Sequence, residues 1–132
     1  MASDLSKYLG NLMCRWLAGE AMPTPPADLE LSLWNGDPKG AGTEVTTTIR
    51  PAGRIAGAFT PPANDGVTNT MALDSDANFG VADAGVTVTH MAVHDAASAG
   101  DILASKSVGT NVIAASDVVK FLAADLVFTI GS

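Results

Sequence analysis

The sequence predicts a mainly β fold, an antiparallel β-sandwich or barrel of about six to eight short strands with one N-terminal amphipathic α-helix. Three observations lead to this prediction. Short segments in which apolar and polar residues alternate recur along the chain, and this period of two is typical of half-buried strands. Clusters of Gly, Pro, Asn and Asp separate these segments. The strands do not alternate with helices, which argues against a parallel α/β sheet.

The first segment, residues 1–20, is predicted to be an amphipathic helix. Its apolar residues recur at spacings of three and four, which places them on one face of a helix. They are Leu5, Tyr8, Leu9, Leu12, Met13, Trp16 and Leu17. We expect Ser3 to be the N-cap, Asp4 to lie in the first turn near the positive end of the helix dipole, and Gly19 to end the helix in a left-handed conformation.

A proline-rich link, residues 21–27, separates the helix from a single β-rich domain, residues 28–132. Pro23, Pro25 and Pro26 cannot continue a helix and favour extended neighbours. The apolar face of the helix must be covered, and two arrangements are open. It packs on its own sheet, or it packs on another protein while the link holds the helix away from the sheet. The candidate interface residues are Leu5, Tyr8, Leu12, Trp16 and Leu17.

The strands are expected where apolar residues alternate or β-branched residues cluster. The expected strands are residues 29–34, 45–49, 54–60, 68–73, 86–95, 102–108, 118–122 and 126–130. In residues 86–95 the apolar positions switch from one face of the strand to the other. We therefore expect a β-bulge or a change of burial near His90.

Composition excludes several classes of protein. The chain has 132 residues, of which 47% are apolar and 16% charged, so it is long enough for one packed domain and is not disordered. Its net charge is -7, and its few basic residues are scattered, so we expect neither nucleic acid nor a membrane as partner. Cys14 is the single cysteine, which rules out an internal disulfide and fits synthesis in the cytoplasm. We expect no signal peptide and no membrane span.

The sequence offers one weak candidate for a metal site. Asp74, Asp76 and Asn78 have the spacing of the oxygen ligands that open a calcium loop, and Asp83 could add a ligand. The rest of an EF-hand is missing, because Phe79 stands where that loop needs glycine. The more economical interpretation is an acidic turn, so we expect neither a metal nor a cofactor.

Catalytic chemistry has little support in the sequence. His90 and His94 share one face of a regular strand but lie about 13 Å apart there, too far to bind one metal ion. No nucleophile lies at a characteristic spacing from a base, and Cys14 lies on the predicted helix near its apolar face. We therefore expect a protein that is not an enzyme and that acts by packing against other proteins.

Two segments resemble a known family. Residues 29–38 read LELSLWNGDP and precede a glycine-rich loop, and residues 88–103 read VTHMAVHDAASAGDIL. With the N-terminal helix, the proline-rich link and the alternating last strand, they resemble a family of small tailed-bacteriophage virion proteins. Its members are usually described as tail fibre proteins, and some resemble capsid decoration, or cement, proteins.

This resemblance implies a structural protein of the virion, made in the host cytoplasm, with no catalytic residues. A compact chain without a repetitive shaft suits a capsid decoration protein that stabilises the head by binding between capsid subunits. The expected partners are the major capsid protein and copies of the chain itself, as a homotrimer. The alternative is a tail fibre or tail-tip protein involved in attachment to the host surface.

Overall fold

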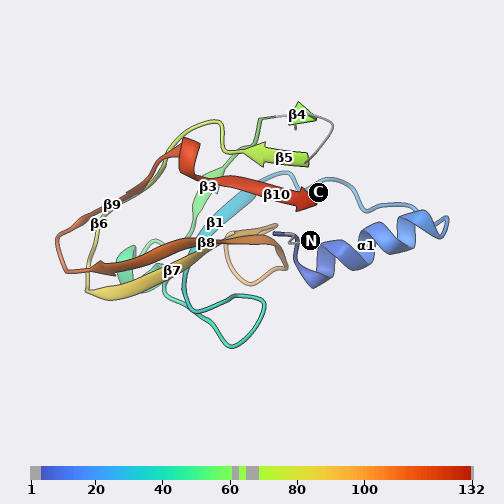
Figure 1. The fold of residues 1–132 in the computed structure, drawn as a ribbon. Coiled ribbons are helices and arrows are strands. Elements are labelled where there is room, and N and C mark those ends of the chain that lie inside the picture. Colours follow the sequence, from blue (N-terminus) through green and yellow to red (C-terminus); the bar gives the residue numbers. More distant parts are fainter. Residues whose placement is uncertain (1–3, 61–62, 65–68, 132) are drawn as a thin grey trace.

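The computed structural model of the chain describes residues 4–60, 63–64 and 69–131, and it is mainly β (Figure 1). Its elements are α1 (Lys7–Leu17), β1 (Leu29–Asn35), β2 (Thr43–Glu44), α2 (Thr46–Ile49), β3 (Ile55–Gly57), β4 (Ala63–Asn64), β5 (Asn69–Ala72), β6 (Ala77–Val81), β7 (Val86–His94), β8 (Ile102–Ile113), β9 (Val118–Phe121), the 3-10 helix η1 (Ala123–Asp125) and β10 (Val127–Gly131). None of the helices in these ranges is both long and apolar enough to cross a bilayer.

The strands form three antiparallel sheets. The largest has the order β2-β1-β7-β8, with β3 also paired to β1; the others are β10-β5-β4 and β6-β9. Every strand pairing described is antiparallel, as the sequence predicts. The sheets do not close on one another, because the largest sheet ends at β8 and the β6-β9 pair is separate, so the barrel alternative is wrong.

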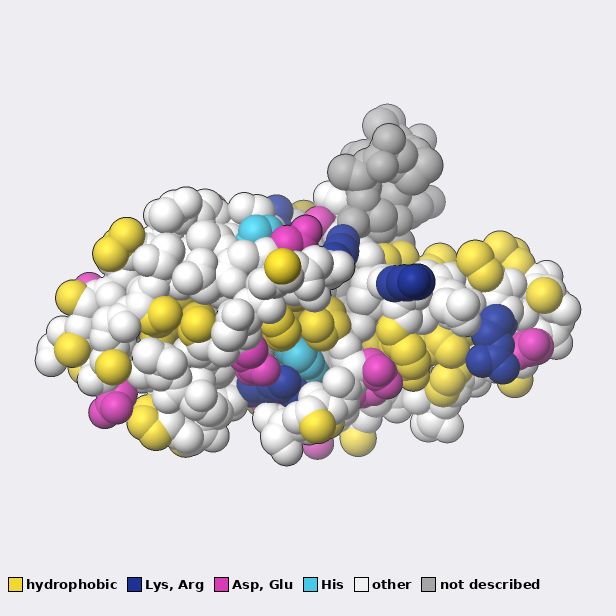
Figure 2. Space-filling view, turned by 90° about the horizontal axis from the view of Figure 1, so that it is seen from below, with side chains coloured by type: hydrophobic (Ala, Val, Ile, Leu, Met, Phe, Trp, Pro, Cys, Tyr) yellow, Lys and Arg dark blue, Asp and Glu magenta, His cyan; other side chains and the backbone are white. Residues whose placement is uncertain are grey.

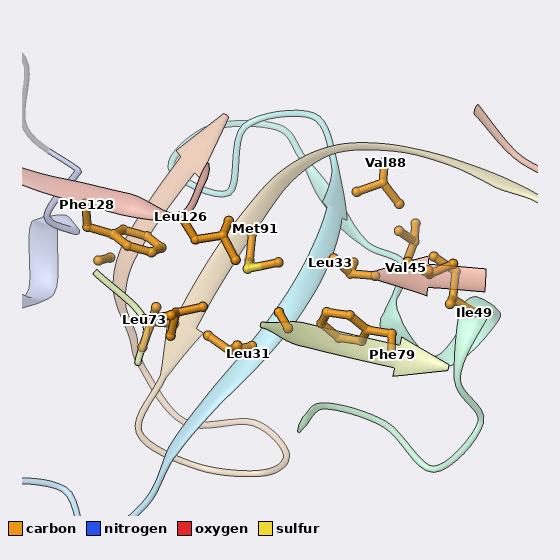
Figure 3. Close-up of a cluster of buried hydrophobic side chains, with 14 of the residues drawn as sticks. Leu31, Leu33, Val45, Ile49, Leu73, Phe79, Val88, Met91, Leu126 and Phe128 are labelled. Atoms are coloured by element: carbon orange, nitrogen blue, oxygen red, sulfur yellow. The ribbon is translucent and has the colours of Figure 1, made fainter. Parts of the chain in front are cut away.

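One hydrophobic core joins the three sheets (Figure 3). Leu31 and Leu33 alternate along β1, as the sequence predicts, and both are buried beside Met91 of β7. Leu126 and Phe128, in and just before the last strand, point into the same core. The alternation of β1 and β10 therefore marks the core face of each strand correctly.

The expected irregularity near His90 is present. The β7–β8 register shifts between Val88 and His90, opposite residues 108–110 of β8. Gly109 has φ +76°, and the Asn111 side-chain amide donates to the carbonyl groups of Val108 and Gly109. The bulge explains the switch of apolar side, and β7 is buried on both faces beyond it.

The N-terminal segment differs from its prediction. Ser3 lies outside the described residues, and Ser6 is the N-cap, because its Oγ accepts a hydrogen bond from Leu9 N at 3.1 Å. Asp4 and Leu5 precede the helix in extended form, and Leu5 bridges Ala104 of β8. The helix starts late because backbone pairing with β8 satisfies these residues better than one more helical turn. Gly19 ends the helix with φ +97°, as expected.

Two local predictions are wrong. Residues 45–49 are β-branched and were expected to form a strand, but Thr46–Ile49 is the short helix α2. Burial of Ile49 and the bond from Leu33 N to Thr46 Oγ1 favour this turn over extension. Strand β6 (Ala77–Val81) was not predicted, because its small and polar residues suggest a turn.

Asp4 forms hydrogen bonds with strands of two sheets, so a substitution at this residue tests how α1 is attached. Its amide donates to Thr129 O at 2.8 Å, its carboxylate accepts from Thr129 N at 2.7 Å, and its carbonyl accepts from Ser105 N at 2.8 Å. We expect Asp4→Ala to lower the free energy of unfolding by about 1–2 kcal/mol, because Thr129 N loses a charged acceptor. Denaturant titration measures this. Asp4→Asn keeps an acceptor oxygen and should retain most of the stability; equal losses in both variants would contradict this role.

Candidate functional site

Helix α1 extends away from the β-sheets as an arm (Figure 1). Its first turn is fixed by Ser6 and by the extended residues before it, and its main neighbour is β8. No residue of α1 is buried. The sheets therefore cover the apolar face of the helix only in part: Leu9 and Leu12 are half-buried, and the helical residues after Leu12 are exposed.

The candidate interface residues differ in exposure along the arm. Leu5 and Leu12 are half-buried near the sheets. Tyr8 is exposed on one side of the helix, while Trp16 is 59% exposed and Leu17 is 78% exposed at its end. Figure 2 shows apolar side chains gathered along this end of the molecule. Exposed apolar surface costs about 25 cal/mol per Å², so an uncovered tip of this kind favours association.

The proline-rich link packs against the helix and defines an apolar hollow. This hollow of about 330 Å³ is lined by Tyr8 and Leu12 of the helix, by Met22 and Pro23 of the link and by Leu103 of β8. The hollow supports the helix on one flank and leaves the tip uncovered. The ion pair between Arg15 Nε and Glu20 Oε2, 2.6 Å long, lies at the same tip and is exposed, so it adds little stability.

A second cluster of side chains is polar and lies within the β-sheets. Arg54, whose side chain is 8% exposed, pairs with Glu44 at 2.8 Å. Its guanidinium also donates to the carbonyl groups of Ala96 and Ala99. Burial raises the pKa of Glu44, but hydrogen bonds from Arg54 and Thr46 outweigh it and hold that pKa below its usual range. Arg54 thus fastens the β7–β8 loop to β2.

Sequence reasoning missed this cluster. Glu44 and Arg54 are ten residues apart, outside any helical or strand periodicity, and the carbonyl acceptors lie in a distant loop. The single sequence signal was that Arg50 and Arg54 are the closest pair of basic residues. The Arg50 guanidinium donates instead to the carbonyl groups of Gly53 and Arg54, within its own turn.

His94 lies beside this cluster and is 2% exposed. Its Nε2 is 2.7 Å from Ser32 Oγ, which also accepts a hydrogen bond from Trp34 Nε1, and the Trp34 ring stacks on the imidazole. Burial, followed by the charge of Arg54, lowers the pKa of His94 to about 4, so the ring is neutral at pH 7. A serine–histidine bond can form a nucleophile and base, but both residues are buried from substrate.

The two histidines do not meet. His90 lies opposite Trp34 and His94 opposite Glu30, at the two ends of the β1–β7 pairing. His90 Nδ1 is bonded to Thr89 Oγ1 at 2.9 Å. In the described ranges, no three His, Cys, Asp or Glu side chains are placed to hold a metal ion.

The weak calcium candidates have other partners. Asp76 accepts from Ala123 N at 2.9 Å and pairs with Lys120, and the backbone bond is the first cause that lowers its pKa. Asn78 Oδ1 accepts from Gly80 N. Asp74 is bonded to Ser75 Oγ, and Asp83 lies beyond the other end of β6. These contacts fix the start of β6 against β9.

Comparisons with known proteins identify one family. The family model described as "Podophage GP4 fiber I protein gp80" matches residues 4–129. This match covers the arm, the link and all three sheets. No curated protein matches the chain.

The buried imidazole makes stability depend on pH. The folded protein binds a proton at His94 less readily than the unfolded chain, whose histidine has a pKa near 6.5. The free energy of unfolding should therefore fall as the pH drops from about 6.5 towards about 4, by up to about 3 kcal/mol. Denaturant titrations at several pH values measure this slope. His94→Gln can keep the bond to Ser32 without titrating, so its curve should be flatter; identical slopes would refute the assignment.

Proposed function

The chain belongs to the podophage GP4 fiber I protein gp80 family, and from this premise we propose that it is a subunit of the fibre apparatus of a phage tail. Membership makes it a structural protein of a tailed-phage virion. The family model matches residues 4–129, so it includes both the arm and the sheets. In this role the protein helps to build the structure that attaches the phage to the host surface.

The observation that carries the proposal is the uncovered apolar arm. An amphipathic helix whose apolar side chains lie in water is a common recognition element, because it can enter an apolar groove of another protein. Trp16 would be its anchor, since tryptophan is among the residues that most often dominate binding energy at an interface, and the exposed Leu17 would extend the apolar contact. Many identical copies would multiply a weak contact of this kind into a stable assembly.

A second candidate function is capsid decoration. The compact body, with no repetitive shaft in the described residues, favours it. In this role the protein would bind between subunits of the major capsid protein, as a homotrimer at a three-fold position, and stabilise the head. The same arm would then bind the capsid protein or a sister subunit. Neither role needs a catalytic step.

Copy number separates the two roles. In a fibre subunit we expect tens of copies or fewer per virion, because tails offer few attachment points, whereas decoration requires hundreds in fixed ratio to the capsid protein. Quantitative mass spectrometry of purified virions, with the major capsid protein as the internal standard, measures this ratio. Hundreds of copies would reject the fibre role and favour decoration.

The arm itself can be tested by a double substitution. We expect Trp16→Ala with Leu12→Ala to reduce incorporation into virions by about tenfold or more, a loss of about 1.4 kcal/mol in binding, while the isolated protein stays folded. Incorporation is measured in virions complemented with the variant, and folding by thermal unfolding. Asn11→Ala, on the polar side of the same helix, is the matched control. An equal loss of folding and incorporation would mean that the helix belongs to the core of its own domain.

A further inference from the structure

We propose that copies of this chain exchange their arms, so that residues 4–6 and α1 of one copy occupy the place that they hold in another. The smallest closed product of such an exchange is a reciprocal dimer. The inference goes beyond the proposed function, because it concerns how the base of the arm is bound. It applies to a fibre subunit and to a capsid decoration protein alike.

Residues 4–6 form a short extended segment that fills a slot between β8 and β10. Asp4 N donates to Thr129 O of β10, and Asp4 O accepts from Ser105 N of β8, both at 2.8 Å. The Asp4 carboxylate also accepts from Thr129 N. The two strands belong to different sheets, and they do not pair with each other in the described residues. The occupant of the slot is therefore a segment of this sequence, and the same segment of a second copy would make the same bonds there.

Little else fastens the arm to its own copy. No residue of α1 is buried, and residues 18–28, which connect α1 to β1, are all exposed. Prolines 23, 25 and 26 have no amide hydrogen to donate, and residues 21–28 make no backbone hydrogen bond with the described residues. Release of the arm therefore breaks few interactions outside the slot, and a second copy restores those within it.

The hinge of the exchange is the turn at Gly19, where the chain reverses from α1 into the proline-rich link (Figure 1). Gly19 has φ +97°, and Glu20 N donates back to Arg15 O. Glycine adopts left-handed and right-handed backbone conformations about equally well, so this turn can open without steric cost. In the exchanged form, the link of one copy lies beside the helix of the other, and the apolar hollow between helix and link is rebuilt from two copies.

Exchange also covers the apolar tip of the arm. Once the hinge opens, each arm runs from its own link to the body of the other copy, so both tips lie between the two bodies. Trp16 is 59% exposed and Leu17 is 78% exposed in the single chain, and contact between two tips removes both from water. Arg15 is paired with Glu20, so the tip has no net charge and two tips do not repel each other. This new contact favours the exchanged form as the protein concentration rises.

A disulfide across the slot tests the exchange directly. Leu5 pairs with Ala104 of β8, and the backbone hydrogen bonds lie on either side of this pair. The Cα atoms of such a pair are typically about 4.5 Å apart, which a disulfide can span. One variant carries Leu5→Cys and a second carries Ala104→Cys. Both also carry Cys14→Ser, because the native thiol is exposed and would react.

Neither variant can form this disulfide within its own chain. We expect an equimolar mixture, refolded together at about 0.1–1 mM and oxidised, to contain at least about tenfold more of the 5–104 disulfide than a mixture refolded at about 1 μM. Peptide mass spectrometry measures it, and circular dichroism checks folding. Leu17→Cys replaces Leu5→Cys in the control and should not link to Ala104→Cys, because Ala104 is 1% exposed.

A double variant shows whether the disulfide can form at all. A single chain with Leu5→Cys, Ala104→Cys and Cys14→Ser should give covalent dimers when refolded at high concentration and an internal disulfide when refolded at low concentration. If this variant gives internal disulfides at every concentration and the mixture gives no link between chains, the exchange is wrong.

The hinge is tested by Gly19→Ala. Alanine is strained at φ +97°, whereas the open hinge places no such demand on residue 19, so the substitution penalises the closed form. We expect it to lower the dimer dissociation constant by about tenfold or more, measured by sedimentation velocity. Gly53 has φ +92° and equal space for a Cβ atom, so Gly53→Ala adds the same strain in the body and should leave association unchanged. A monomeric Gly19→Ala protein, or an equal effect of Gly53→Ala, would overturn the inference.

These experiments fail independently of the proposed function. If no exchange occurs but Trp16→Ala with Leu12→Ala still blocks incorporation into virions, the tip binds a different virion protein and only the exchange is wrong. If the arms exchange but that double variant incorporates normally, the exchange stands and the role of the tip in attachment fails.

Discussion

The pairing of β1 with β7 is the constraint on which the rest of the structure depends. Leu31, Leu33 and Met91 form one face of this pair and are almost completely buried. The opposite face carries Ser32 and His94, which are buried too. Because both faces are withdrawn from water, the remaining strands must cover one with apolar side chains, and polar groups on the other must find hydrogen bonds inside the protein.

That constraint accounts for the polar cluster. Ser32 on the second face is hydrogen-bonded to His94 and Trp34, whereas His94 Nδ1 is buried without a hydrogen-bond partner among the described residues. The pKa of His94 falls because the ring has little water around it. Arg54 closes the neighbouring region by binding Glu44 and the carbonyl groups of the β7–β8 loop. A serine, a histidine and a charged pair lie close together here for structural reasons, and their burial explains why proximity of these residue types does not by itself indicate catalysis.

Apolar side chains of the β-sheets are buried in one core, whereas those at the end of the arm are exposed. The core joins all three sheets, whereas α1 is fixed at its first turn through Asp4 and Ser6 and has no buried residue. Exposed apolar surface of this kind marks a site of protein–protein contact. Such a site is expected in a family of phage virion proteins, which act by assembling with other proteins.

The local spacing of apolar residues determined much of this structure. It predicts the amphipathic face of the helix, the core positions of β1 and the bulge near His90, because each depends on periodicity over a few residues. Local pattern misled at Thr46–Ile49 and β6, where burial and pairing with distant strands outweigh propensity. Only the tertiary structure decided that Glu44 meets Arg54, that the arm lies uncovered and that β8 and β9 stay apart. Those features depend on which distant segments of the chain come into contact, and the periodicity of the sequence does not show which segments do.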